Sequence, residues 1–85
     1  MVDVVIYTKS YCPYSDECKK LLESKGVKYT ENLIDNDSLL KSEMEMKSGG
    51  RTDTPQVFIG GNHIGSGDDL KVLDKQGELD KMLSL

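Results

Sequence analysis

The chain has 85 residues, of which 36% are hydrophobic and 31% charged, and its formal net charge is -4. This length predicts one domain over residues 1–85, and this balance excludes a disordered or membrane protein. No apolar run approaches the roughly 18 residues that cross a bilayer, and the acidic start does not resemble a secretory signal. We therefore expect a cytoplasmic protein that binds neither membranes nor, given its negative charge, nucleic acids.

The first half of the chain predicts two strands and two helices. Residues 2–7 are short and rich in β-branched side chains, which is typical of a buried strand. A loop over residues 8–11 leads to a helix from about Pro13 to Lys25, with Gly26 after its end. Residues 27–33 alternate between apolar and polar and predict a second strand. Asp37 or Ser38 caps a helix that runs to about residue 48.

The second half predicts a hairpin followed by two helices. Residues 57–59 form a third strand, Gly60-Gly61-Asn62 a tight turn, and His63 and Ile64 a fourth strand. A third helix follows over residues 68–75 and a short one over about 78–83. The strand–helix–strand unit implies parallel pairing with a right-handed crossover, and the hairpin implies an antiparallel edge. The sequence thus predicts an α/β fold, a four-stranded mixed sheet with helices on both faces.

Cys12 follows the first strand and stands where the first helix begins. The free N–H groups and the dipole of a helix N-terminus favour a negative charge, and thiols there have pKa values lowered to roughly 3.5–7.5. Lys9 and Lys19 are expected to lower the pKa of Cys12 further. We therefore interpret Cys12 as an exposed, reactive thiolate and as the candidate nucleophile.

The other cysteine, Cys18, repeats at helical spacing with Leu21 and Leu22 and is interpreted as a core residue. Cys12-Pro13-Tyr14-Ser15 has the frame of a redox C-x-x-C motif, but its fourth position is Ser15. A hydroxyl cannot attack a mixed disulfide as a resolving thiolate does. No metal site is expected, because two Cys and one His do not supply four protein ligands at the usual spacings.

Three segments, VVIYTKSYCPYS, TPQVFIGGNHIGSGDDL and LDKQGEL, occur in the order in which the glutaredoxin family has its functional motifs. The chain resembles that family over essentially its whole length, as a dithiol-type C-P-Y-C glutaredoxin with Ser at the second cysteine position. The resemblance implies a thioredoxin-like fold and glutathione as co-substrate. It also implies that the Thr54–Pro55 bond is cis, whereas the bare frequency of X-Pro bonds favours trans.

The resemblance implies a role for each matching position. Cys12 resembles the nucleophile, and Tyr14 flanks the bound tripeptide. Lys9 lies near the glycine carboxylate, and the backbone of Thr54, before Pro55, pairs with the cysteinyl part. The γ-glutamyl end is held by the turn that contains Ser66, Gly67, Asp68 and Asp69.

Besides Ser15, the chain departs from the family pattern at Gly65-Ser66-Gly67, where Gly-Gly-Cys is common and the turn should be preserved, and at two positions before Pro55. Thr54 occupies a place where valine is common, and Asp53 adds a negative charge near the glutathione site, which is expected to weaken binding of an anionic tripeptide. Arg51 either forms a local salt bridge or assists the tripeptide carboxylate. Outside the site, His63 is interpreted as a surface or strand residue, and Met44 and Met46 cannot both face the core.

These features predict a monomeric glutathione-dependent thiol–disulfide oxidoreductase that works by a monothiol route, with glutathionylated or disulfide-containing proteins as partners. Two alternatives stay open. One is a protein that binds a glutathione-ligated [2Fe–2S] cluster between two subunits, although that class has C-G-F-S in place of C-P-Y-S. The other is an engineered Cys-to-Ser form that traps a glutathione mixed disulfide.

Overall fold

The elements of the computed structural model, which describes residues 2–85, follow the predicted order with small displacements of their ends. The strands and helices are β1 (Val4–Thr8), α1 (Pro13–Ser24), β2 (Thr30–Leu33), α2 (Ser38–Lys47), β3 (Gln56–Ile59), β4 (Asn62–Gly65), α3 (Gly67–Lys75) and α4 (Glu78–Met82). None of the helices within residues 2–85 has the length and apolar character that crossing a bilayer requires.

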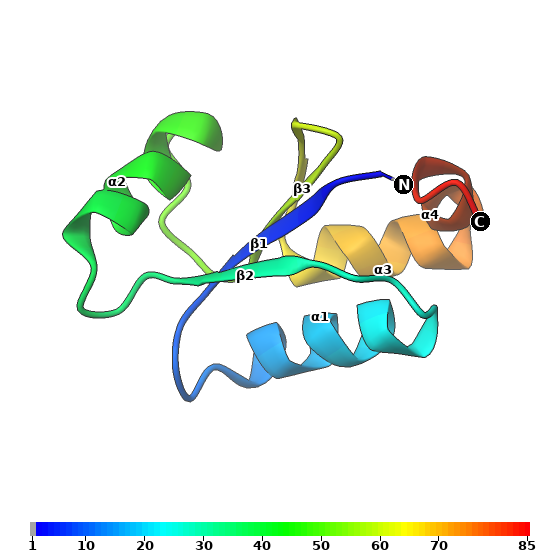
Figure 1. Ribbon diagram of the computed structural model, residues 1–85, viewed down its shortest axis with the longest axis horizontal. Coiled ribbons are helices and arrows are strands. Elements are labelled where there is room, and N and C mark those ends of the chain that lie inside the picture. Colours follow the sequence, from blue (N-terminus) through cyan, green and yellow to red (C-terminus); the bar gives the residue numbers. More distant parts are fainter. Residues whose placement is uncertain (1) are drawn as a thin grey trace.

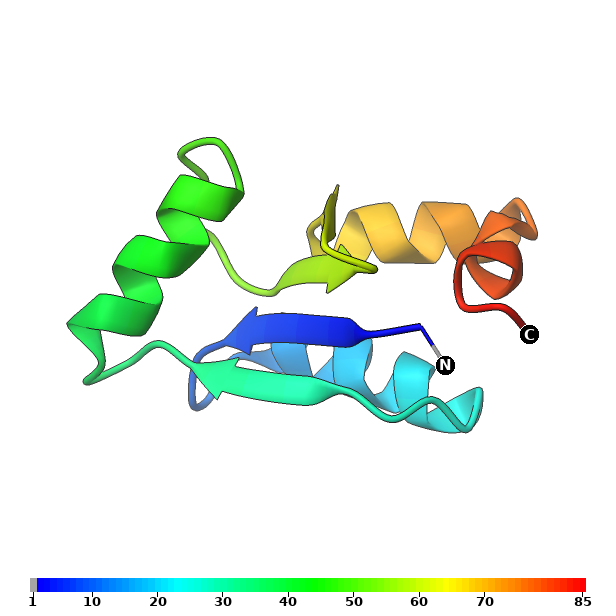
Figure 2. The same cartoon turned by 45° about the horizontal axis from the view of Figure 1, so that its top comes forward.

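The four strands form one mixed sheet in the order β2-β1-β3-β4. β1 pairs with β2 in parallel, whereas β3 is antiparallel to both β1 and β4. Figure 2 shows the arrows of β1 and β2 pointing the same way and the arrow of β3 pointing the opposite way. The predicted four-stranded mixed sheet is confirmed.

Alternating side chains of β1 divide the core between the two faces of the sheet. Val4 and Ile6 belong to a cluster with α1, α3 and α4, while Tyr7 belongs to a second cluster that contains Met44 of α2. Figure 1 shows α2 apart from the other three helices. Helices therefore cover both faces, as predicted. The first cluster contains Val4, Ile6, Cys18, Leu22, Val57, Ile59, Leu70, Leu79 and Leu83.

The first two strands begin later than the sequence predicts. β2 begins at Thr30, where its pairing with Val5 of β1 begins, and not at residue 27. The reason is that the N–H of Val27 donates to the carbonyl of Leu22 at 3.2 Å and so completes the end of α1. β1 begins at Val4, opposite the last residue of β3, because the chain of β3 then turns away.

The hairpin between β3 and β4 has a two-residue turn, one residue shorter than predicted. Asn62 already pairs with Ile59, so that only Gly60 and Gly61 form the turn. Their φ angles are 59° and 82°, a left-handed conformation that glycine adopts at little cost and that a type I′ turn requires. β4 then continues to Gly65, at the edge of the candidate site.

Three residues outside the site have the structural roles that the sequence indicates. Met44 is fully buried, whereas Met46 is 82% exposed, as helical spacing requires. His63 lies in β4, and its Nε2 is 2.7 Å from Oε1 of buried Gln56. His63 is thus an exposed strand residue, as expected.

Candidate functional site

Cys12 is the N-cap residue of α1. Its backbone is extended, with φ -103° and ψ 106°, and its carbonyl accepts the first helical hydrogen bond from Asp16 at 3.1 Å. Pro13 follows in the first turn, where a missing N–H costs nothing. The side chain of Cys12 is half-buried at the end of the helix whose backbone N–H groups are free.

The thiol of Cys12 meets Thr54 in the loop before β3. The sulfur is 3.4 Å from Oγ1 of Thr54 and 3.9 Å from its carbonyl oxygen. The Thr54–Pro55 peptide bond is cis, as the resemblance implies. Valine, which is common at this position of the family, could not make the hydroxyl contact. Thr54 is therefore a side-chain neighbour of the sulfur, a role that the sequence analysis did not predict.

Hydrogen bonding around the sulfur lowers the pKa of Cys12. Partial burial acts in the opposite direction and raises the pKa. When the sulfur is ionised, hydrogen bonds from the side chains of Ser15 and Thr54 and from the backbone N–H groups of Ser15 and Tyr14 outweigh this effect, so that the pKa of Cys12 lies below its usual value. The predicted thiolate character is supported, and neutral donors at the start of α1 and on Thr54 account for it.

The two lysines expected to assist Cys12 have other neighbours. The ammonium of Lys19 lies 2.9 Å from Glu31 and 3.6 Å from Asp16. Lys9 is an exposed residue whose charge lowers the pKa of Asp35, though less than the hydrogen bonds from Ser10 do. The leading causes of the lowered pKa of Cys12 include neither lysine, so that the contribution expected from Lys9 and Lys19 stays a prediction.

Ser15 is fully buried one helical turn after Cys12. Within residues 2–85, its hydroxyl is the buried side-chain oxygen that finds no hydrogen-bond partner in the thiol form of the site. An unpaired buried hydroxyl costs roughly 1–3 kcal/mol. Ionisation of Cys12 would supply the missing acceptor, because the thiolate can accept the hydroxyl proton. Ser15 therefore favours the thiolate over the thiol.

Replacing Ser15 with alanine is expected to raise the pKa of Cys12 toward its ordinary value and to slow alkylation of Cys12 by iodoacetamide at neutral pH. The reaction rate measured against pH gives the pKa, and the rate above pH 9 should be retained. The free energy of unfolding should stay the same or rise, since the unpaired hydroxyl is removed. An unchanged pKa would contradict this role.

Cys18 is buried in the cluster between α1 and the sheet, as predicted. Burial raises the pKa of its thiol to about 11, and the nearby charge of Lys19 offsets this only in part. At neutral pH Cys18 is a protonated thiol without access to solvent. It cannot replace the second cysteine that the motif lacks.

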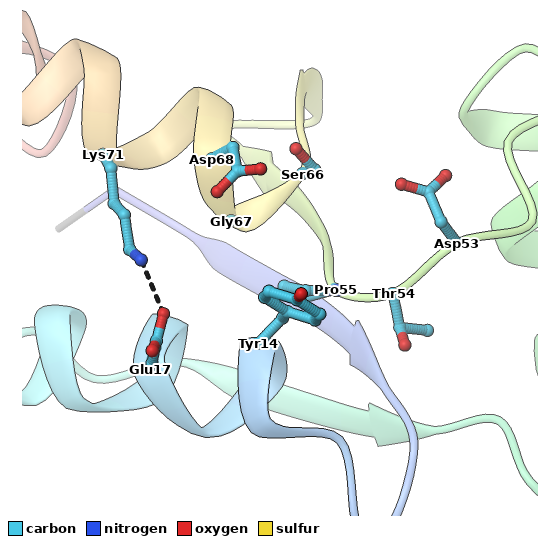
Figure 3. Close-up of a pocket in the computed structure, with 9 residues that line it drawn as sticks. All are labelled: Tyr14, Glu17, Asp53, Thr54, Pro55, Ser66, Gly67, Asp68 and Lys71. Carbon is cyan, nitrogen blue, oxygen red and sulfur yellow. Dashed lines mark hydrogen bonds and ion pairs between the residues drawn. The ribbon is translucent and has the colours of Figure 1, made fainter.

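A pocket of about 230 Å³ opens beside Thr54 between α1, the loop before β3 and the start of α3. Figure 3 shows Tyr14 and Pro55 at its centre, with Glu17 and Lys71 at one end and Asp53 at the other. Tyr14 is 64% exposed, so that one ring face is open to a ligand. The lining residues are Tyr14, Glu17, Asp53, Thr54, Pro55, Ser66, Gly67, Asp68 and Lys71.

A capping box shapes the turn before α3. The Ser66 hydroxyl accepts from the N–H of Asp69 at 3.5 Å, and the Asp69 carboxylate accepts from the Ser66 N–H at 2.8 Å. This moves the helix start to Gly67, one residue before the predicted Asp68. The N–H groups of Gly67 and Asp68 are in the first turn, where they have no partner within the helix. An anionic group in the pocket could accept from them.

The structure brings most of the predicted site residues together. Four predicted residues lie outside the lining of the pocket: Cys12, Lys9, Ser15 and Asp69. Cys12 contacts the lining residue Thr54, and the Asp69 carboxylate caps α3. Glu17 and Lys71, which the sequence analysis missed, form an ion pair across the pocket's end. Each follows a predicted site residue by three positions on its helix, so that helical spacing could have identified both. The predicted residues in the lining are Tyr14, Thr54, Pro55, Ser66, Gly67 and Asp68.

A thioredoxin-like fold with a reactive cysteine at the start of its first helix, facing the residue before a cis-proline, defines a class of thiol–disulfide oxidoreductases. The glutaredoxin family profile matches residues 4–64. Glutaredoxin 3 of Escherichia coli strain K12 is 49% identical over 83 residues, which cover 98% of this chain and 99% of that protein. A glutaredoxin of Pseudomonas aeruginosa is 44% identical over 84 residues, 99% of each chain. The chain belongs to the glutaredoxin family.

Solved structures agree with this assignment. The buckwheat glutaredoxin–glutathione complex superposes with a TM-score of 0.88 at 30% identity, over 98% of this chain and 77% of that one. The solution structure of glutaredoxin from Brucella melitensis gives a TM-score of 0.84 at 44% identity, over 98% and 89%. As a family member, the chain is a glutathione-dependent thiol–disulfide oxidoreductase.

Proposed function

We propose that this protein removes glutathione from protein mixed disulfides by a monothiol route through Cys12. The main support for the proposal is that the two cysteines differ in pKa and in burial. Cys12 has a lowered pKa and contacts Thr54, which lines the pocket, whereas Cys18 is buried in the core. The motif position where a resolving thiol would stand is Ser15, whose oxygen cannot form a disulfide.

The reaction then has two exchanges. The Cys12 thiolate attacks the glutathione sulfur of a protein–glutathione disulfide, forming a Cys12–glutathione disulfide and releasing the protein thiolate, which takes up a proton. A second glutathione, as its thiolate, attacks the glutathione sulfur of that bond. Oxidised glutathione leaves and the Cys12 thiolate is regenerated. The net reaction consumes one glutathione thiol: the mixed disulfide is replaced by oxidised glutathione, the protein thiol is released, and no second protein cysteine is required.

The pocket supports a defined orientation of the tripeptide in this proposal. The γ-glutamyl carboxylate accepts from the N–H groups at the start of α3, and the Asp68 carboxylate accepts from the α-ammonium. The cysteinyl backbone pairs with the backbone of Thr54, beside Pro55, which brings its sulfur to Cys12. Tyr14 covers one side, Lys9 approaches the glycine carboxylate, and Asp69 holds the Ser66–Gly67 turn in place.

Incubation with oxidised glutathione tests the route. Intact mass should show one added glutathione, mapped to Cys12 by peptide analysis, and excess reduced glutathione should remove it. The adduct should be absent from Cys12→Ser and present in Cys18→Ala. No adduct, an adduct on Cys18, or an intramolecular disulfide between Cys12 and Cys18 would contradict the proposal.

A further inference from the structure

Asp53 brings a negative charge to the pocket next to Thr54. Its side chain is about half exposed, and it lies at the opposite end of the pocket from Glu17 and Lys71 (Figure 3). In the orientation proposed above, the γ-glutamyl end lies at the start of α3 and the cysteinyl part at Thr54. The remaining C-terminal end of the tripeptide then runs toward Asp53, because Asp53 directly precedes Thr54.

The carboxylate of Asp53 is held in one position by two neighbours. Arg51 donates to both of its oxygens at 2.8 Å, from Nε to Oδ1 and from Nη2 to Oδ2. Buried Gln56 donates from Nε2 to the same Oδ1 at 3.2 Å and to the Asp53 carbonyl at 3.0 Å. The hydrogen bond from Arg51 holds the pKa of Asp53 below its usual value, so that Asp53 is ionised at neutral pH.

Two roles were predicted for Arg51, a local salt bridge and a contact with the tripeptide carboxylate. Asp53 occupies the edge of the Arg51 guanidinium that carries Nε and Nη2, in a bidentate contact. The structure therefore has the local salt bridge. The side chain that could have neutralised a ligand carboxylate is therefore bound to a carboxylate of the protein.

The rest of the pocket supplies no substitute for Arg51. Its nine lining residues include three carboxylates, on Glu17, Asp53 and Asp68, and one cation, Lys71. The Lys71 ammonium is bound to Glu17, at the end of the pocket away from Asp53. A ligand carboxylate near Asp53 thus meets a fixed like charge with no lining cation beside it, since Lys9, proposed above for the glycine carboxylate, lies outside the lining.

We propose that Asp53 is a specificity residue that disfavours a free carboxylate at the C-terminal end of the thiol co-substrate and favours a neutral end, such as an ester or amide. The inference rests on the proposed function, since it uses that orientation of the tripeptide. For partly exposed charges the preference should be about three- to fivefold in kcat/KM, and larger at low salt than at high salt.

The experiment compares glutathione with its glycyl ethyl ester as the second thiol in deglutathionylation of one glutathionylated peptide. The unmodified protein should have the higher kcat/KM with the ester at low salt, after correction for the thiolate fraction of each free thiol. Asp53→Asn keeps an oxygen for Gln56 but removes the charge and releases Arg51, so that the preference should reverse toward glutathione. Arg51→Gln should increase the preference for the ester.

Two further variants make the result specific. Arg51→Gln combined with Asp53→Asn removes both charges and should make the two thiols nearly equivalent. Asp74→Asn changes the net charge by the same amount outside the pocket, where Asp74 pairs with Lys25, and should keep the preference of the unmodified protein.

The outcomes separate this inference from the proposed function. If the unmodified protein has the same kcat/KM with both thiols, and Asp53→Asn changes neither value, the role of Asp53 is overturned while the monothiol route stands. If neither thiol regenerates Cys12, the proposed function itself fails.

Discussion

Cys12→Ser is expected to reduce deglutathionylation to the rate that glutathione alone achieves, a loss of about a thousandfold or more in kcat/KM. The serine hydroxyl is almost entirely protonated at neutral pH, and its oxygen cannot exchange with a disulfide. The donors that lower the pKa of Cys12, from Ser15, Thr54 and the start of α1, cannot compensate for the missing sulfur. A coupled assay with a glutathionylated peptide measures the loss.

The matched control is Cys18→Ala. Cys18 lies in the core between α1 and the sheet, with a pKa near 11, and takes no part in the proposed exchange. This variant should unfold more easily, because a buried sulfur is lost, yet keep most of its activity below the unfolding transition. Comparable losses of activity in Cys12→Ser and Cys18→Ala, both verified as folded, would contradict a reaction carried by Cys12 alone.

Gly65→Ala is expected to lower the free energy of unfolding by about 2–4 kcal/mol, the combined size of a strained backbone and a lost helix cap. Gly65 has a φ of 127°, which side chains rarely allow. A Cβ there would lie 2.8 Å from the carboxyl carbon of Asp69 and closer still to its Oδ2. That oxygen accepts from the Ser66 N–H, so that relief of the clash breaks the capping box. Urea unfolding measures the change.

Gly65→Ala should also bind glutathione more weakly, because the capping box shapes the turn that lines the pocket. Combining Gly65→Ala with Asp69→Ala separates the backbone strain at position 65 from the clash with the Asp69 carboxylate. It removes the carboxylate that the new Cβ would meet, so that the double variant should be destabilised by less than the sum of the single variants. Strict additivity would mean that the clash with Asp69 plays no part and that backbone strain alone acts.

Local patterns were enough to predict the elements and the nucleophile. β-branched and alternating residues define the strands, and Pro13 and Gly26 bracket α1, because helix and strand formation depend on neighbours a few positions apart. Cys12 could be identified for the same reason, since its place between a strand and a helix start is a local property. The strand ends were less predictable because pairing with β1 decides where β2 begins.

The composition of the site was decided by tertiary packing. Thr54 reaches the Cys12 sulfur across 42 positions of the chain, and Lys71 pairs with Glu17 across 54 positions, from one helix to another. No local spacing encodes such contacts, which depend on how α1 and α3 pack on one face of the sheet.

The sequence by itself determined that this protein has one reactive cysteine at a helix start and lacks a resolving thiol beside it. Only the tertiary structure decided what surrounds that cysteine. Ser15 is more than a missing thiol because packing buries its hydroxyl without a partner within residues 2–85, and Thr54 becomes a neighbour of the sulfur because the loop before β3 packs against the start of α1. Burial and the direction of a hydrogen bond arise only once distant segments are in contact.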